Sequence, residues 1–453
     1  MRDADVRDCN GCPTLHIDGQ PVTGLMHWKW NVEEVDAANF GRCGVPLFSF
    51  IGQLWLGAGP DPSQPVVYGD VQTPFPAMTP EVIDRTMRTL LAGNPDVLVL
   101  PRIRMVPPEW WKQAHPGELM VHYSLEKREF VRGPLAAVTS SRWLADATRA
   151  LVAAVEYFEA HWGDRVIGYH TGFGHCAEHA CFWGNVVSDY STPQLKAFRE
   201  WLRSKYGSVD ALRTAWGQPT LDFATVEFPP PASVLGAATS QSPLMLGAGS
   251  RWRVDFQQFT AEAMADSVIL QAKTVKRTLA KLGRRKVYST FYGYINLEAN
   301  SAAHFGVGHN AQQRVLSSPD VDMICAPISY AARQPGGFST AQVLPGSIGL
   351  HGKLYYGEDD TGTHLASAHH GYVANDADGA VNNLRRNFLD IWRSGGSLWW
   401  MDLRGQGWFY DDALLAEITR LRQFADETLA RRASTAAIAV FASDRSEHAM
   451  RGY

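Results

Sequence analysis

The sequence has little cysteine, no surplus of basic charge and no long apolar run. Six cysteines scattered over 453 residues are too few for a disulfide scaffold and predict reduced thiols. Lysine and arginine (42) are balanced by aspartate and glutamate (46), so the chain lacks the basic excess that neutralises a nucleic-acid backbone. No run of about 18 apolar residues occurs, and the amino terminus is charged where a signal peptide is apolar. These features predict a soluble, cytoplasmic protein that binds neither nucleic acid nor a membrane.

Aromatic residues, by contrast, are plentiful and make up 11% of the chain, with 15 tryptophans among them. Many of the tryptophans stand beside turn residues or at the ends of apolar runs. Aromatic side chains dominate protein cores, so core packing is one interpretation. The other is that some of these rings form stacking surfaces for sugar rings, whose C–H faces are apolar.

Eight short apolar runs alternate with helical patterns along nearly the whole chain. The predicted strands are residues 24–30, 46–51, 96–105, 165–171, 286–292, 321–329, 353–358 and 396–402. This count predicts an α/β fold, a (β/α)8 TIM barrel with long insertions after strands two and four, at residues 52–80 and 208–250. A doubly wound sheet is the alternative, but no GxGxxG follows the first strand. We therefore expect no nucleotide cofactor, and no other cofactor is predicted.

The predicted barrel occupies residues 21–432 and divides the rest of the chain into two short pieces. Residues 1–20 form an amino-terminal segment. Residues 433–453 begin with the apolar sequence STAAIAVFASD, which predicts a further buried strand. One strand cannot make a domain, so we expect either a tail on the barrel or, preferably, the start of a truncated carboxyl-terminal domain.

Functional groups of such a barrel are expected just past the carboxyl ends of its strands. The carboxylates found there are Glu178, Glu298, Glu358, Asp359, Asp360 and Asp402. Hydrolysis of an acetal needs one carboxyl group to protonate the leaving oxygen and a second to attack the anomeric carbon or activate water. Strands four and seven lie on opposite sides of an eight-stranded ring. The residues that follow them, Glu178 and Glu358, are therefore the predicted catalytic pair.

Several segments of the sequence resemble glycoside hydrolase family 42, the β-galactosidases. They are VIGYHTG, DYSTPQLKAFREWLRSKYGSVDALRTAWG and VEFPPP from residue 166, PPEWWKQAHPGE at residues 107–118, and SLWWMDLRGQGWFYDD near the last strand. The resemblance implies a retaining β-glycoside hydrolase that acts by double displacement, with Glu358 as nucleophile. The family carries its acid/base glutamate in an Asn-Glu pair after strand four, where this chain has Phe173 and Gly174. The chain thus resembles a divergent branch whose acid is Glu178.

The resemblance also suggests residues that support the reaction and bind the substrate. Arg102, two residues from Arg104 on strand three, would keep the nucleophile ionised. Tyr330 would hydrogen-bond Glu358, and His170 would bond a sugar hydroxyl beside the acid. Trp400 is the predicted platform under the sugar. The expected partner is an oligosaccharide or glycoside, with β-galactosides preferred, and STAAIAVFASD resembles the start of a trimerisation domain, which leaves a homo-oligomer open.

Two other functions remain open at the level of sequence. The missing Asn-Glu pair is compatible with a non-catalytic carbohydrate-binding barrel. A metal-dependent hydrolase on the same fold is the second alternative, because histidine, cysteine and glutamate are ordinary zinc ligands. Its candidate ligands are His175, Cys176, Glu178 and His179, with the adjacent His369 and His370.

Overall fold

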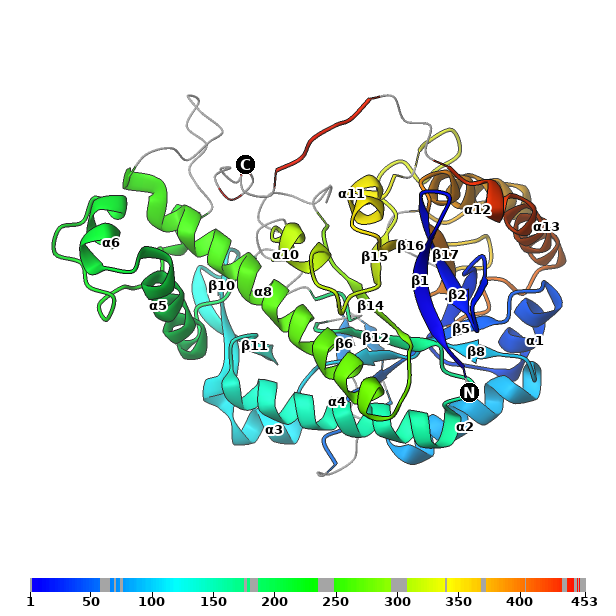
Figure 1. The fold of residues 1–453 in the computed structure, drawn as a ribbon, viewed down its shortest axis with the longest axis horizontal. Helices are drawn as coiled ribbons and strands as arrows, with labels where there is room; N and C mark the ends of the chain where they lie inside the picture. Colours follow the sequence, from blue (N-terminus) through cyan, green and yellow to red (C-terminus); the bar gives the residue numbers. More distant parts are fainter. Residues whose placement is uncertain are drawn as a thin grey trace.

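Eight parallel strands close into a barrel in the computed structural model (Figure 1). The structure describes residues 2–57, 66–68, 71–73, 76–174, 177–179, 186–234, 248–294, 308–338, 340–367, 372–403, 405–433, 438–443, 446 and 448. The barrel strands are β4 (Met26–Lys29), β5 (Leu47–Gln53), β8 (Leu98–Val99) with β9 (Arg102–Arg104), β12 (Gly168–Gly172), β14 (Val287–Phe291), β15 (Met323–Pro327), β16 (Leu354–Asp359) and β17 (Ser397–Asp402). Pairing of β4 with both β17 and β5 closes the ring. The predicted (β/α)8 fold is confirmed.

The third strand is interrupted, and β8 and β9 are its two parts. Both pair in parallel with β5. Pro101 lies between them and has no N–H group to donate to the ladder. The interruption leaves Arg102 and Arg104 at the carboxyl end of the strand, where a barrel of this kind holds its functional groups.

Helices surround the barrel and follow its strands in turn. They are α1 (Glu34–Arg42), α2 (Pro80–Gly93), α3 (Glu109–Ala114), α4 (Ser141–Trp162), α5 (Thr192–Tyr206), α6 (Val209–Trp216), α7 (Pro231–Val234), α8 (Ala248–Lys281), α10 (Gln312–Leu316), α11 (Pro345–Leu350), α12 (Ala377–Arg393) and α13 (Asp412–Thr428), with 3-10 turns η1 (Pro116–Glu118) and η2 (Leu429–Arg431). Ser140 caps α4 and Ser191 caps α5 through their side-chain oxygens, as such residues do at helix starts. None of the described helices is both long and apolar enough to span a membrane.

A small antiparallel sheet closes the amino-terminal end of the barrel. It consists of β1 (Ala4–Cys9), β2 (Cys12–Ile17) and β3 (Gln20–Pro21). Leu15 and Ile17 pack into the barrel core, and the Ala4 N–H donates to the carbonyl of Arg285 just before β14. This sheet therefore covers the end of the barrel at which its strands begin. The carboxyl-terminal end is the one available for a functional site.

A second group of additions extends the carboxyl-terminal side, at the left of Figure 1. An antiparallel sheet is formed there by β10 (Leu119–Ser124), β11 (Glu129–Ala136) and β13 (Val186–Val187). A separate two-stranded sheet, which is not part of this group, pairs β6 (Val66–Tyr68) with β7 (Val71–Thr73). A separate apolar core joins β13 with α5, α6 and the amino-terminal part of α8, around Phe198, Trp216 and Phe256. The hairpin β10–β11 after the third strand was not predicted.

The apolar segment near the carboxyl terminus does not form the buried strand that its sequence predicts. Residues 438–443 have no regular secondary structure. Ile438, Val440 and Phe441 are 84%, 92% and 94% exposed. Apolar character indicates a strand only where another element covers it, and none of the described elements buries these side chains.

Candidate active site

Glu358 lies at the end of β16 and is almost fully buried. Its Oε2 atom accepts a hydrogen bond from Nη2 of Arg102 at 2.8 Å and another from Nε1 of Trp399 at 2.9 Å. Side chains alternate between the two faces of a strand, so Tyr356 and Glu358 point inward while their neighbours point to the helices. The predicted pairing of Arg102 with Glu358 is present in the structure.

Arg102 is held inside a cage of three aromatic rings. Its guanidinium carbon lies 4.7 Å from the ring centres of Trp28 and Phe291 and 4.8 Å from that of Trp399. Each ring attracts the cation through its quadrupole, most strongly where water is excluded. Because Arg102 is fully buried, its charge and Glu358 stabilise each other as an ion pair in the barrel interior.

Glu178 reaches the mouth of the barrel because the loop after β12 folds back on that strand. Backbone angles in the left-handed region at Ala177 and His179 turn the chain, and the His179 ring contacts the Thr171 carbonyl oxygen at 3.2 Å. The Ala177 carbonyl lies so close to Gly172 that a Cβ there would overlap it. Glu178 is thereby buried near the end of strand four, and its Oε1 atom accepts a bond from Tyr294 at 3.4 Å.

The two carboxyl groups have different electrostatic surroundings. Burial, followed by the charge of Glu358, raises the pKa of Glu178 to about 8. Burial also raises the pKa of Glu358, but the adjacent guanidinium of Arg102 and the Trp399 N–H favour its ionised form. Among the described residues, Glu178 accepts one long hydrogen bond, from the phenol of Tyr294. When the pair holds one proton, we therefore expect it on Glu178.

A third carboxyl group, Asp360, lies beside this pair and raises the pKa of both. It forms an ion pair with Arg333 at 2.7 Å and accepts a hydrogen bond from the Tyr330 hydroxyl at 3.0 Å. The Tyr330 hydroxyl, predicted to bond Glu358, is thus directed to Asp360. The physical reason is that Arg333, whose guanidinium stacks on the Tyr330 ring at 4.1 Å, holds the phenol next to its own counter-ion.

His170 lies in the barrel interior beside the residues that surround Arg102, whereas Trp400 occupies a place other than its predicted one. His170 is fully buried in the barrel interior, with its Nδ1 atom 3.0 Å from Ser289 Oγ and its ring against Phe291. Trp400 is also fully buried, and its ring lies 6.2 Å from that of Phe40 on α1, on the outer face of the barrel wall. The predicted platform is therefore corrected: strand alternation turns Trp400 away from the mouth and Trp399 toward it.

Four residues that contact the buried carboxyl groups or Arg102 are not among the predicted site residues: Trp28, Trp399, Tyr294 and Arg333. Trp28 lies near Trp30, and Trp399 is next to Trp400. The sequence alone does not indicate which tryptophan of each pair faces the site. Tyr294 follows β14, where the barrel rule could have selected it. Arg333 lies in the segment after β15, and no spacing in that segment indicates an ion pair.

Of the candidate zinc ligands, Glu178 and His179 are among the residues that the structure describes. His175, Cys176, His369 and His370 lie outside the described residues. In the described part of the chain, no group of three histidine, cysteine, aspartate or glutamate side chains is arranged to hold a metal ion.

A family model described as beta-galactosidase, glycoside hydrolase family 42, matches residues 78–302, about half of the chain. In this region the sequence is similar to that of glycoside hydrolase family 42. A beta-galactosidase of Thermus thermophilus is 29% identical over 152 residues, which cover 32% of this chain and 22% of that relative. A Thermus sp. beta-galactosidase, BgaA, is 28% identical over the same length. The match thus spans only about a fifth of the relatives' length.

Several solved structures of other proteins share the barrel fold of this chain. The catalytic domain of beta-amylase from Paenibacillus polymyxa superposes with a TM-score of 0.61 at 12% identity, over 88% of this chain and 97% of that one. A beta-galactosidase from the psychrophilic Marinomonas ef1 superposes with a TM-score of 0.58 at 18% identity, over 90% and 60%. At these identities the likeness establishes the barrel fold.

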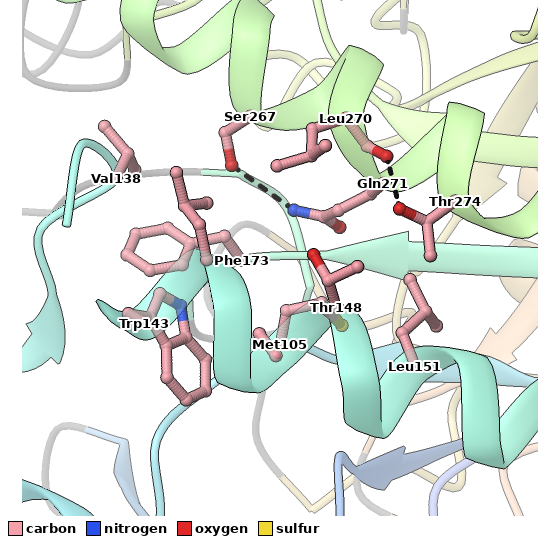
Figure 2. A pocket seen from close by; sticks show the side chains of 12 residues that line it. Met105, Val138, Trp143, Thr148, Leu151, Phe173, Ser267, Leu270, Gln271 and Thr274 are labelled. Atoms are coloured by element: carbon pink, nitrogen blue, oxygen red, sulfur yellow. Dashed lines mark hydrogen bonds between the residues drawn. The ribbon is translucent and has the colours of Figure 1, made fainter. Parts of the chain in front are cut away.

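At the end of strand four, where the resemblance places an Asn-Glu pair, the chain has Phe173 and Gly174, and the structure shows where these two residues lie. Phe173 points outward into a pocket between α4 and α8, where Figure 2 shows it beside Trp143. Gly174 follows with a positive φ of 92°, and its carbonyl accepts a bond from Arg104 at 2.7 Å. The strand therefore ends with a buried phenylalanine and a turn, and residues 177–179, which include Glu178, lie against its carboxyl end.

Proposed function

We propose that this chain is a retaining β-glycoside hydrolase in which Glu178 is the acid/base and Glu358 the nucleophile. The observation that carries the proposal is the pair of buried carboxyl groups with opposite electrostatic support. Arg102 and Trp399 favour the anion of Glu358, whereas burial favours the protonated form of Glu178. A double displacement needs one group of each kind.

In the first step the Glu358 carboxylate attacks the anomeric carbon of the sugar. The bond from that carbon to the leaving oxygen breaks, and the leaving oxygen takes the proton of Glu178. The charge of Glu358 is neutralised when the glycosyl bond forms. Because that charge helps to raise the pKa of Glu178, the pKa falls and Glu178 is left as a carboxylate.

In the second step Glu178 acts as a base toward water. It takes a proton while the water oxygen attacks the anomeric carbon from the face that the leaving group vacated. The bond to Glu358 breaks and its electron pair returns to that carboxylate, which Arg102 stabilises again. Two inversions give a product with the original anomeric configuration.

We propose β-galactosides as the preferred substrates. The support is the name of the matched family and of the Thermus thermophilus relative, both beta-galactosidases. The matched region includes Arg102 and Glu178 but ends before Glu358, so the nucleophile rests on the geometry of β16 and β17. Selectivity among β-linked sugars depends on contacts in the loops at the barrel mouth.

The proposed function is tested with 2-deoxy-2-fluoro β-glycosides that carry a good leaving group. We expect the galactoside to inactivate the protein and to leave a covalent adduct, which peptide mass spectrometry maps to Glu358. The fluorine slows both steps, and the good leaving group restores the first, so the intermediate accumulates. Saccharide binding without any adduct or turnover on a panel of sugars would support the carbohydrate-binding barrel instead.

The folded-back loop is tested by Gly172→Ala. The added methyl group would overlap the Ala177 carbonyl, so the loop must shift and take Glu178 with it. We expect kcat/KM for an aryl β-galactoside to fall about 100-fold, since displacement of a catalytic group by about 1 Å costs that much. Gly346→Ala on α11, where the added methyl has open space, is the control. Equal activity of the two variants would show that this approach does not position Glu178.

A further inference from the structure

Both donors to Glu358 end on the same oxygen atom. Nη2 of Arg102 and Nε1 of Trp399 each bond Oε2, at 2.8 Å and 2.9 Å. Among the residues that the structure describes, no hydrogen bond reaches Oε1. The lone pairs of Oε2 are therefore engaged, while those of Oε1 stay available. The two oxygens of this carboxylate are not equivalent.

The indole of Trp399 is fixed from several sides. It is fully buried, and its ring centre lies 5.0 Å from that of Tyr356 and 5.8 Å from those of Phe291 and His170. The same indole also contacts the guanidinium of Arg102. Since packing leaves the ring one orientation, its N–H is directed at Oε2 whether or not a ligand is present.

We propose that Trp399 is a positioning residue that, together with Arg102, holds Glu358 Oε2 as the spectator oxygen and directs Oε1 at the anomeric carbon. This inference rests on the proposed function. In the first step a lone pair of Oε1 forms the new bond, the bond to the leaving oxygen breaks, and that oxygen takes the proton of Glu178. Oε2 keeps both hydrogen bonds. In the second step their donors stabilise the negative charge that returns to the carboxylate.

The test is Trp399→Phe, which keeps an aromatic ring in the cage and removes the N–H group. We expect kcat/KM to fall about ten- to hundredfold, the usual cost of losing a hydrogen bond to a charged group. Loss of a donor to the carboxylate also raises the pKa of Glu358. Activity requires that group ionised, so the acid limb of the pH profile should move to higher pH. A purely structural role of Trp399 would not move that limb.

Trp392→Phe is the matched control, because it removes another buried indole hydrogen bond, 3.0 Å to Thr428, on α12 outside the barrel. If the phenylalanine variant does not fold, Trp399 is replaced by benzothienylalanine, which has sulfur in place of the N–H and preserves the shape of the side chain. Activity and an acid limb equal to those of the control would overturn the inference while adduct formation on Glu358 still supports the proposed function. A wild-type protein without glycosidase activity would overturn both.

Discussion

Glu358→Gln should abolish turnover of aryl β-galactosides, by about four orders of magnitude or more. The amide is isosteric and can still accept the bonds from Arg102 and Trp399, but it cannot attack the anomeric carbon as an anion. The 2-fluoro glycoside should leave no adduct on the variant. Steady-state rates and mass spectrometry together measure the effect. Ordinary turnover in Glu358→Gln would refute the double-displacement mechanism.

The same variant removes the counter-ion of a buried arginine, so a loss of stability must be separated from a loss of chemistry. Glu159→Gln provides the comparison, because Glu159 on α4 is equally buried and pairs with the buried Lys286 at 2.8 Å. Breaking either pair should lower the free energy of unfolding by about 3–5 kcal/mol. Only Glu358→Gln should lose activity under conditions where both proteins remain folded, as thermal unfolding would verify.

The barrel itself was predictable because its strands are buried on both faces and stand out as apolar runs. Each of the eight predicted runs contains the observed strand or most of it, and β16 places Glu358 where the pattern KLYYGE predicts. The carboxyl ends of the strands are the part of such a fold that the sequence predicts best, since each apolar run stops at the first polar residue. Glu358 was therefore the easier of the two carboxylates to find.

Details that depend on three-dimensional packing could not be predicted. The sequence placed Trp399 and Trp400 side by side, and only the phase of strand alternation decides which one faces the site. The return of Glu178 to the strand tip depends on left-handed backbone angles at Ala177 and His179, two residues that seldom adopt them. Tertiary contacts impose these angles, so local propensity gave no signal of them.

Glu178→Gln should have an effect that depends on the leaving group. For a substrate whose leaving oxygen needs a proton, we expect the first step to slow by about 10²–10⁴-fold, the contribution of a general acid. For an aryl leaving group that departs as a stable anion, the first step should be nearly unaffected. The second step then lacks its base, so the glycosyl-enzyme should accumulate, and a rapid burst of released phenol should precede a slow steady state.

The pH profile gives an independent measure of the same residue. Burial and the charge of Glu358 raise the pKa of Glu178 to about 8, and the acid must be protonated in the free enzyme. The kcat/KM of the wild type should therefore decline as pH rises through about 8. The Glu178→Gln variant has no proton to lose, and its profile should stay flat there, whereas Glu159→Gln should keep the decline. If Glu178→Gln lost the same share of activity with every leaving group and kept the decline at basic pH, another group would be shown to donate the proton.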